Sequence, residues 1–380
     1  MSGLYIHIPF CKQKCNYCDF HFSVSLRSKE ALLEAIKKEL VLRKDELKEP
    51  IQTIYFGGGT PSLLNISELQ DLFKVIHKNY IIDENAEITL EANPDDLSSS
   101  YLNVIKKIGV NRLSVGVQSF FDEDLLFMNR SHTSEQSIRA IKEAQSIGFK
   151  NITIDLIYGI PGLTPEKWQK NLTIFLELKI PHLSSYALTV EPKTALAHQI
   201  KTKKIKALDE KQAKVHFDYL VKFMKQHNYL HYELSNFAKK GFLSKHNTSY
   251  WQGKPYLGIG PSAHSYNTSE RSWNIANNAR YIKSLNKGSL PYQIEELTPS
   301  MRYNEYIMTG LRTMWGIDMD KIKHDFDEKY YSYFNKAIQT HLSKNTLQLI
   351  ENSRVVVAPE SLFLVDGIIA DLFWVGLDTI

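Results

Sequence analysis

The first 190 residues alternate between short runs rich in β-branched residues and longer amphipathic segments. Strands are predicted at 4–8, 53–56, 87–91, 112–116, 152–157 and 182–188, and helices at 29–44, 67–77, 97–107, 134–147 and 165–176. Ser134 and Thr164 are typical N-cap residues, while Gly109 and Gly148 stand where a helix end favours glycine. Repeated strand–helix units build a parallel sheet. About six such units favour an α/β fold, a partial (β/α)6 barrel, over a flat doubly wound sheet.

Most of the predicted strands are followed by a chemically distinctive residue or turn. These stretches are Pro9-Phe10-Cys11, Gly57-Gly58-Gly59-Thr60-Pro61, Glu91-Ala92-Asn93-Pro94, Gly116-Val117-Gln118-Ser119, and Asp155 with Tyr158-Gly159-Ile160-Pro161-Gly162. Barrel enzymes carry their chemistry at the C-terminal ends of the strands. We therefore expect these stretches to converge on one mouth, which favours the barrel further.

The pattern changes after residue 188. An amphipathic stretch at 208–226 leads into an aromatic and glycine-rich region, and a polar loop at 265–277 is expected to be mobile. Helical stretches at 301–314 and 317–342 precede short apolar runs at 347–349, 355–357 and 362–365, which together resemble a winged helix. We expect a partial barrel at 1–235, a connecting region at 236–300 and a mostly helical C-terminal domain at 301–380.

The composition excludes several classes of protein. The net charge of +4 is spread along the chain, whereas a nucleic-acid-binding face is strongly basic and clustered. The most apolar region, 362–377, is interrupted by Asp366 and Asp371, so no membrane span is expected, although a transient membrane association is compatible with the sequence. The first residues do not read as a signal or transit peptide, which favours the cytoplasm. The chain is expected to be a monomer or a dimer.

Cys11, Cys15 and Cys18 are the only cysteines of the chain. An odd number within eight residues does not suit a disulfide framework and suggests a metal site. Iron–sulfur clusters usually recruit four thiolates, so three would leave one iron without a cysteine ligand. A structural zinc ion with His7 or His21 as the fourth ligand is the alternative, although zinc knuckles normally use two separated ligand pairs.

This spacing, with Tyr17 directly before Cys18, resembles the signature of the radical S-adenosylmethionine (SAM) superfamily. The resemblance implies a [4Fe-4S] cluster whose open iron binds SAM, and a partial barrel that carries it. Gly58, Gly59 and Thr60 resemble the motif that holds the methionine group of SAM. The same resemblance assigns further cofactor contacts to Tyr5, Tyr17, Glu91, Gln118, Arg130 and Asp155. Taken singly, the glycine turn is equally a tight connection, and each polar residue is equally a surface or capping residue.

Further motifs narrow the resemblance to the HemW branch of heme chaperones, relatives of oxygen-independent coproporphyrinogen dehydrogenase. The motifs lie at 232–238, at 246–251 (HNTSYW) and at 256–265. The resemblance implies that His246, Tyr250 and Trp251 bind heme, and imidazole and flat aromatic faces suit a heme. Alternatively, His246 and Trp251 only anchor a loop against the barrel. His264 is a candidate for facing SAM or substrate, or equally a structural histidine.

Two features depart from the dehydrogenase. Its signature adds a cysteine where this chain has Phe20, and it carries an N-terminal extension where only ten residues precede Cys11. We therefore expect a heme chaperone with a SAM-binding [4Fe-4S] cluster, which passes heme to acceptor proteins such as respiratory cytochromes and lacks dehydrogenase activity. The alternative is an oxygen-independent coproporphyrinogen III oxidase of porphyrin biosynthesis, and a weaker third is a radical SAM enzyme that modifies tRNA or protein. Catalytic residues stay unassigned.

Overall fold

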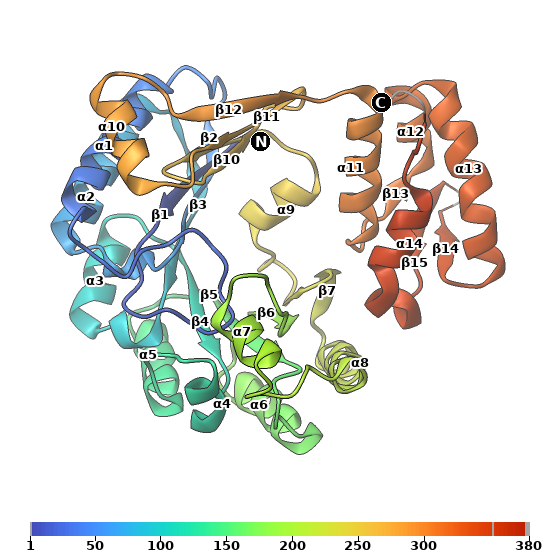
Figure 1. Ribbon diagram of the computed structural model, residues 1–380, viewed down its shortest axis with the longest axis horizontal. Helices are drawn as coiled ribbons and strands as arrows, with labels where there is room; N and C mark the ends of the chain where they lie inside the picture. Colours follow the sequence, from blue (N-terminus) through green and yellow to red (C-terminus); the bar gives the residue numbers. More distant parts are fainter. Residues whose placement is uncertain (1, 352, 377–380) are drawn as a thin grey trace.

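Six parallel strands form the centre of the computed structural model, which describes residues 2–351 and 353–376 (Figure 1). They are β1 (Ser2–Ile8), β2 (Ile51–Gly58), β3 (Ile82–Ala92), β4 (Arg112–Gln118), β5 (Asn151–Tyr158) and β6 (His182–Ala187). The strands lie side by side in chain order. A doubly wound sheet reverses its order at a switch point. The predicted partial (β/α)6 barrel is therefore confirmed.

Helices connect the strands close to their predicted positions. They are α1 (Lys29–Leu42), α2 (Ile66–Asn79), α3 (Ser99–Lys107), α5 (Ser134–Ser146) and α6 (Pro165–Glu177), with an unpredicted short α4 (Asp122–Phe127). Thr164 caps α6 as expected, but the cap of α5 is Thr133, whose hydroxyl accepts the N–H of Gln136. Gly109 and Gly148 follow their helices with φ of 114° and 95°, a conformation that favours glycine.

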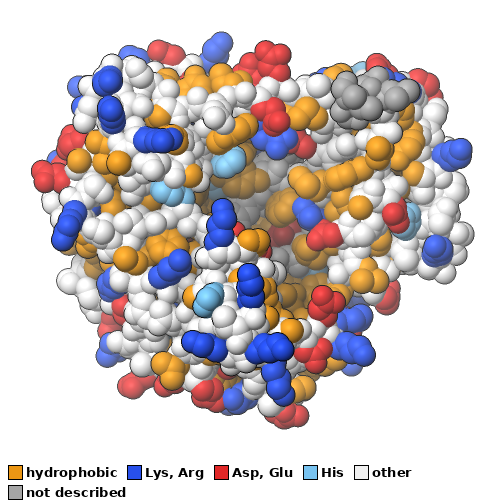
Figure 2. Space-filling view, in the orientation of Figure 1, with side chains coloured by type: hydrophobic (Ala, Val, Ile, Leu, Met, Phe, Trp, Pro, Cys, Tyr) orange, Lys and Arg blue, Asp and Glu red, His pale blue; other side chains and the backbone are white. Residues whose placement is uncertain are grey.

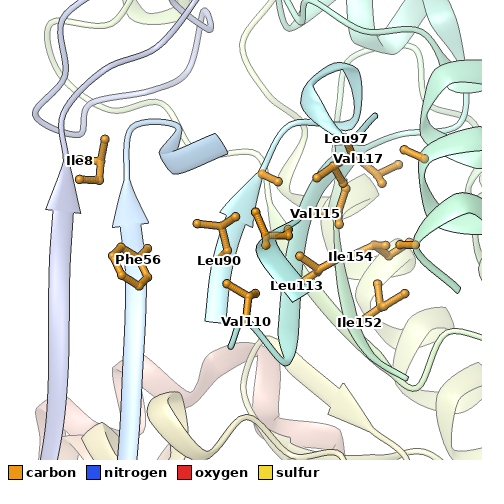
Figure 3. Close-up of a cluster of buried hydrophobic side chains, with 14 of the residues drawn as sticks. Ile8, Phe56, Leu90, Leu97, Val110, Leu113, Val115, Val117, Ile152 and Ile154 are labelled. Carbon is orange, nitrogen blue, oxygen red and sulfur yellow. The ribbon is translucent and has the colours of Figure 1, made fainter. Parts of the chain in front are cut away.

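Alternate residues of the strands point to opposite faces of the sheet. The outward side chains share one apolar core with the helices, and among them are Ile8, Phe56, Leu90, Leu113 and Ile154 (Figure 3). Their neighbours along the strands face the barrel interior and are polar or aromatic: Tyr55, Glu91, Ser114 and Asp155. The same two-residue period thus builds the core and lines the interior.

Shorter strands extend this sheet at both edges. On the side of β6 lie β8 (Asn236–Ala238) and β7 (Leu230–Glu233), preceded by α7 (Ala195–Lys201) and α8 (Glu210–Gln226). On the side of β1 lie β9 (Tyr256–Ile259), β10 (His264–Tyr266), β11 (Glu270–Asn274) and β12 (Tyr292–Glu296). The helices α9 (Lys245–Trp251) and α10 (Asn278–Asn286) belong to the same region. The expected boundary at 235 and 236 falls between the paired strands β7 and β8, and the domain division stays a prediction.

The expectation of a mobile polar loop at 265–277 is wrong, because this segment contains the hairpin of β10 and β11. The side-chain oxygen of Asn267 accepts the backbone N–H groups of Ser269 and Glu270, which forms the turn. Because many side chains of these two strands are polar, the hydrophobic pattern of the sequence does not predict them as strands.

The C-terminal unit follows the order helix, strand, helix, helix, strand, strand, as in a winged helix. Its elements are α11 (Pro299–Leu311), β13 (Ile317–Asp318), α12 (Met319–Asp325), α13 (Glu328–Ser343), β14 (Leu347–Ile350), β15 (Arg354–Val357) and α14 (Val365–Leu372). The strands form an antiparallel sheet, and the unit has an apolar core of its own. The predicted unit reaches residue 380, and positions 377–380 lie outside the described residues. No helix among the described residues is long and apolar enough to cross a membrane.

Candidate functional site

A cavity of about 600 Å³ opens at the C-terminal ends of the parallel strands. Its lining brings together residues that are far apart in the sequence, including Cys11, Cys15, Tyr17, Cys18, Gly58, Gly59, Thr60, Glu91, Gln118, Arg130 and Asp155. Of the residues assigned above to the cluster and SAM, Tyr5 alone does not line this cavity. Its ring lies 6.1 Å from that of Tyr55 and 6.4 Å from that of His246. The convergence expected at the strand ends is therefore observed.

The three cysteines lie in the loop between β1 and α1, with free and partly buried thiols. Backbone hydrogen bonds tie this loop to its neighbours: Cys11 N–H donates to Ser23 at 3.1 Å, and Asn16 N–H donates to Met128 at 3.1 Å. Burial raises the pKa of the Cys11 thiol, and it raises the pKa of Cys18 to about 11. Cys11 and Cys18 therefore hold their protons until a metal displaces them.

The two histidines of the zinc alternative are engaged elsewhere. His7 contacts the hydroxyl of Tyr5 at 3.1 Å and the backbone oxygen of His21 at 2.9 Å. His21 is 2.8 Å from the side-chain oxygen of Asn278. Within the described ranges, no group of three or more His, Cys, Asp or Glu side chains is placed to hold a single metal ion. A cluster is larger than one ion, and three thiols facing one cavity fit a cluster with an open iron.

Arg130 links the cysteines to the neighbouring strand ends. Its Nη1 donates to the Cys15 sulfur at 3.3 Å. Its Nη2 donates to Asn93 Oδ1 at 2.7 Å and to the Gly116 carbonyl at 2.9 Å. Its buried Nε has no hydrogen-bond partner among the described residues. An unsatisfied guanidinium N–H is costly when it is buried, so this group suits a carboxylate ligand.

Two carboxylic acids face the same cavity. Glu91 accepts the hydroxyl of Tyr55 at 2.7 Å and the N–H of Gly58 at 3.2 Å. Burial, with a contribution from the charge of Asp155, raises the pKa of Glu91 to about 7. Burial also raises the pKa of Asp155 to about 6. A ligand that offers an ammonium group or hydroxyls to these carboxylates would lower both pKa values.

Backbone geometry explains why glycines stand in the turn after β2, and Gln118 has an unusual backbone conformation. A Cβ on Gly59 would lie 2.6 Å from the Phe10 carbonyl oxygen, and one on Gly58, where φ is +109°, would lie 2.5 Å from the His7 ring. The glycine turn therefore lets the end of β2 pack against the cysteine loop. Gln118 adopts a φ of 70° at an irregularity in β4, and its side-chain oxygen accepts the hydroxyl of Tyr186 at 3.3 Å.

A smaller cavity of about 130 Å³ lies deeper in the barrel and shares Glu91, Ser114, Asp155 and Tyr186 with the first. Arg112 also lines it and is 1% exposed. Sequence reasoning missed Arg112, although its position at the start of a strand with three buried aliphatic residues, Leu113, Val115 and Val117, was a signal. A buried arginine at such a position needs partners inside the barrel.

His246 is buried where α9 meets β2. Its Nδ1 lies 2.8 Å from the hydroxyl of Thr53, and its Nε2 lies 2.6 Å from the hydroxyl of Tyr250. The backbone N–H of His246 donates to Glu87 at 3.1 Å. Both ring nitrogens are thus bonded within the protein, whichever tautomer is present. The imidazole holds α9 to the barrel and is not free to coordinate iron in this arrangement. His264 stacks on Trp273, with the ring centres 6.1 Å apart.

Tyr250 and Trp251 reach a different place. They line a groove of about 700 Å³ between α9 and the C-terminal unit. Figure 2 shows the surface hollowed between the two parts, with hydrophobic side chains along the edges of the hollow. The groove shares no lining residue with the cysteine cavity. The sequence motif that contains His246 therefore divides, with the histidine inside the barrel and the two aromatic residues at the groove.

Comparisons with known proteins agree with this geometry. Residues 5–173 match the family model of the radical SAM superfamily. The chain is 35% identical to the heme chaperone HemW of Bacillus subtilis (strain 168), over 94% of each chain. It is 33% identical to the heme chaperone HemW of Lactococcus lactis subsp. lactis (strain IL1403), over 91% of this chain and 90% of that protein. The chain belongs to the HemW family.

The HemW fold is shared with a solved radical SAM enzyme. The structure of coproporphyrinogen III oxidase (HemN) from Escherichia coli superimposes with a TM-score of 0.85 and 25% identity, covering 98% of this chain and 90% of that one. The likeness includes both the barrel and the C-terminal unit. Membership of the radical SAM superfamily implies SAM and a [4Fe-4S] cluster as cofactors.

Proposed function

We propose that this chain binds heme and passes it to acceptor proteins, and that it holds a SAM-binding [4Fe-4S] cluster on Cys11, Cys15 and Cys18. The observation that carries the proposal is the groove beside α9, which is separate from the cysteine cavity and has Tyr250 and Trp251 in its wall. One chain thus offers a cofactor site and a second site for a flat ligand. The names of its HemW relatives support the heme assignment.

The cofactor site has residues suited to each part of SAM. When bound, the cluster supplies a single electron to SAM. The unpaired Nε of Arg130 suits the methionine carboxylate, and the cavity carboxylates of Glu91 and Asp155 suit an ammonium group or ribose hydroxyls. Gln118 offers an amide, while Tyr17 lies in the wall and Tyr5 behind it. Three free cysteines also suit the reducing cytoplasm, where we place the protein.

The proposed function also requires a protein that accepts the heme. A chaperone must release its cargo, so its site is expected to be open to a partner, as the groove is. Respiratory cytochromes are the acceptors we propose. In this proposal Tyr250 and Trp251 contact the heme, while His246 acts from inside the barrel by holding the hydroxyl of Tyr250.

Heme binding is tested by titrating the purified chain with hemin and following the Soret band. Trp251→Ala should weaken binding about tenfold, because an indole face buried against a ligand contributes roughly 1–2 kcal/mol. Trp273→Ala removes a tryptophan outside the groove and should bind hemin as the unaltered chain does. If the unaltered chain takes up no stoichiometric heme, the proposed function is wrong.

A second candidate function is oxygen-independent coproporphyrinogen III oxidation, in porphyrin biosynthesis. The likeness to the Escherichia coli enzyme over nearly the whole chain favours it. Phe20 lines the cysteine cavity and is 70% exposed, so the cavity is open to solvent beside Phe20. An anaerobic assay with coproporphyrinogen III, SAM and a reductant decides between the two functions. Protoporphyrinogen formed in many turnovers would favour the enzyme.

A further inference from the structure

The groove between α9 and the C-terminal unit carries an excess of positive charge. Five cationic and three acidic side chains line it. The acids are engaged within the protein. Glu305 pairs with Arg271, and Asp325 lies 3.6 Å from Lys321. Asp318 caps α12 by accepting the backbone N–H groups of the next turn.

Three cations remain for a ligand. Arg302 and Lys254 form no ion pair with any residue in the described part of the chain. Arg354 is only loosely paired, because its Nε lies 3.9 Å from Glu351, a side chain that is 76% exposed and outside the groove. Two of these residues come from the C-terminal unit and one follows α9. The whole lining has two more cations than acids, so the groove is complementary to a ligand with two negative charges.

The same groove has aromatic side chains on both sides. Tyr250 and Trp251 come from α9, while Tyr306 and Trp315 come from the C-terminal unit. Flat aromatic faces on two sides suit a flat, largely apolar ligand. The charges and the aromatic faces thus point to one kind of molecule.

Backbone hydrogen bonds join the C-terminal unit to the β7 edge of the barrel. Met314 N–H donates to the Tyr232 carbonyl at 3.0 Å, and Leu234 N–H donates to the Arg312 carbonyl at 2.9 Å. A groove that is formed before binding loses less entropy when the ligand enters.

We propose that this groove binds a flat aromatic macrocycle with two carboxylates, and that Arg302, Arg354 and Lys254 pair with those carboxylates. The inference rests on the proposed heme function and deepens it. It assigns the second wall of the heme site and the recognition of the propionates to the C-terminal unit. The cysteine cavity takes no part in holding the macrocycle.

The proposal is tested with the full chain and hemin at low ionic strength. The double variant Arg302→Ala/Arg354→Ala should raise the dissociation constant about tenfold or more, because two charge-assisted contacts are lost. The matched control is Arg139→Ala/Arg280→Ala, which removes two exposed arginines outside the groove and should leave binding unchanged. Near-UV circular dichroism checks that both double variants are folded, and their spectra should match that of the unaltered chain.

Hemin dimethyl ester tests the same contacts from the side of the ligand. The unaltered chain should bind the ester about tenfold more weakly than hemin. The groove variant should show a much smaller difference between the two ligands, because Lys254 alone then remains to pair with a carboxylate. Equal binding of hemin by the groove variant and the unaltered chain would overturn the groove assignment and leave heme binding intact. No hemin binding by the unaltered chain would overturn both proposals.

Discussion

Glu91 and Asp155 show how a ligand site is prepared at the level of single residues. They come from strands separated by β4, and both carboxyl groups face the cavity that the cysteines line. They are removed from bulk water on most sides, so the protonated form is favoured and both pKa values rise. The ligand-free protein carries an unfavourable charge arrangement here, which a bound ammonium group would relieve.

The raised pKa of Glu91 predicts a pH-dependent stability. The folded chain keeps this proton up to about pH 7, whereas a glutamic acid ordinarily loses it near pH 4.5. The folded state therefore binds more protons between these values, and stability falls as pH rises through the window. We expect the ligand-free chain to lose about 2 kcal/mol from this group between pH 4.5 and pH 7.

Urea unfolding at a series of pH values measures this loss. Glu91→Gln should flatten the dependence, although Asp155 retains a smaller slope up to about pH 6. Glu84→Gln, at an exposed position, is the matched control and should keep the full slope. An unchanged slope in Glu91→Gln would contradict the assignment.

His246 shows what a residue's type leaves undecided. Its place in a motif identified it as a functional histidine, and the type alone allowed either an iron ligand or an anchor. The ring lies between Thr53, on a strand far away in the sequence, and Tyr250 on its own helix. Only the packing of α9 against β2 brings the Thr53 hydroxyl to Nδ1, whereas the Tyr250 hydroxyl reaches Nε2 from four residues further along the same helix.

At the level of elements, the cysteine loop depends on the end of β2. Gly59 N–H donates to the Ile8 carbonyl at 2.9 Å, and Thr60 N–H donates to the Phe10 carbonyl at 2.7 Å. These bonds fasten the turn after β2 to the residues that precede Cys11. A side chain on Gly59 would collide with the Phe10 backbone.

Gly59→Ala should therefore displace the loop and impair cluster assembly. Anaerobic reconstitution of the unaltered chain is expected to give about four irons per chain, and the variant should fall well below that number. Gly367→Ala is the matched control, because a Cβ there meets nothing within 4 Å and should leave the iron content unchanged. Full iron content in Gly59→Ala would show that the loop tolerates the shift.

The elements also show where a hydrophobic pattern fails. Strands of the barrel are apolar on the face toward the helices, so their positions were predicted from the sequence. The hairpin of β10 and β11 lies near the sheet edge with several partly exposed polar residues, so its sequence reads as a loop. The short α4 was missed because six residues give too little periodicity.

At the level of the whole molecule, the two cavities are separate. The cysteine cavity belongs to the barrel, and the groove lies between α9 and the C-terminal unit. Because no lining residue is shared, heme binding should not require the cluster.

Cys15→Ser tests this independence. The variant should lose the iron of the cluster after reconstitution, since one of three thiolate ligands is missing. It should still bind hemin within about twofold of the unaltered chain, a difference below roughly 0.5 kcal/mol. Iron content and a hemin titration on the same sample give both readings. Loss of both properties together would show that the sites are coupled.

The sequence by itself determined the barrel and the family, and it predicted the cysteine site, because strand periodicity, thiol spacing and glycine turns are local patterns. The tertiary structure alone decided how the parts of the HNTSYW motif divide, since a helix of seven residues points its side chains toward both the barrel and the groove. It also decided that Arg302, Arg354 and Lys254 line the same groove. Such contacts join segments distant in the chain, and packing of the C-terminal unit against the barrel creates them.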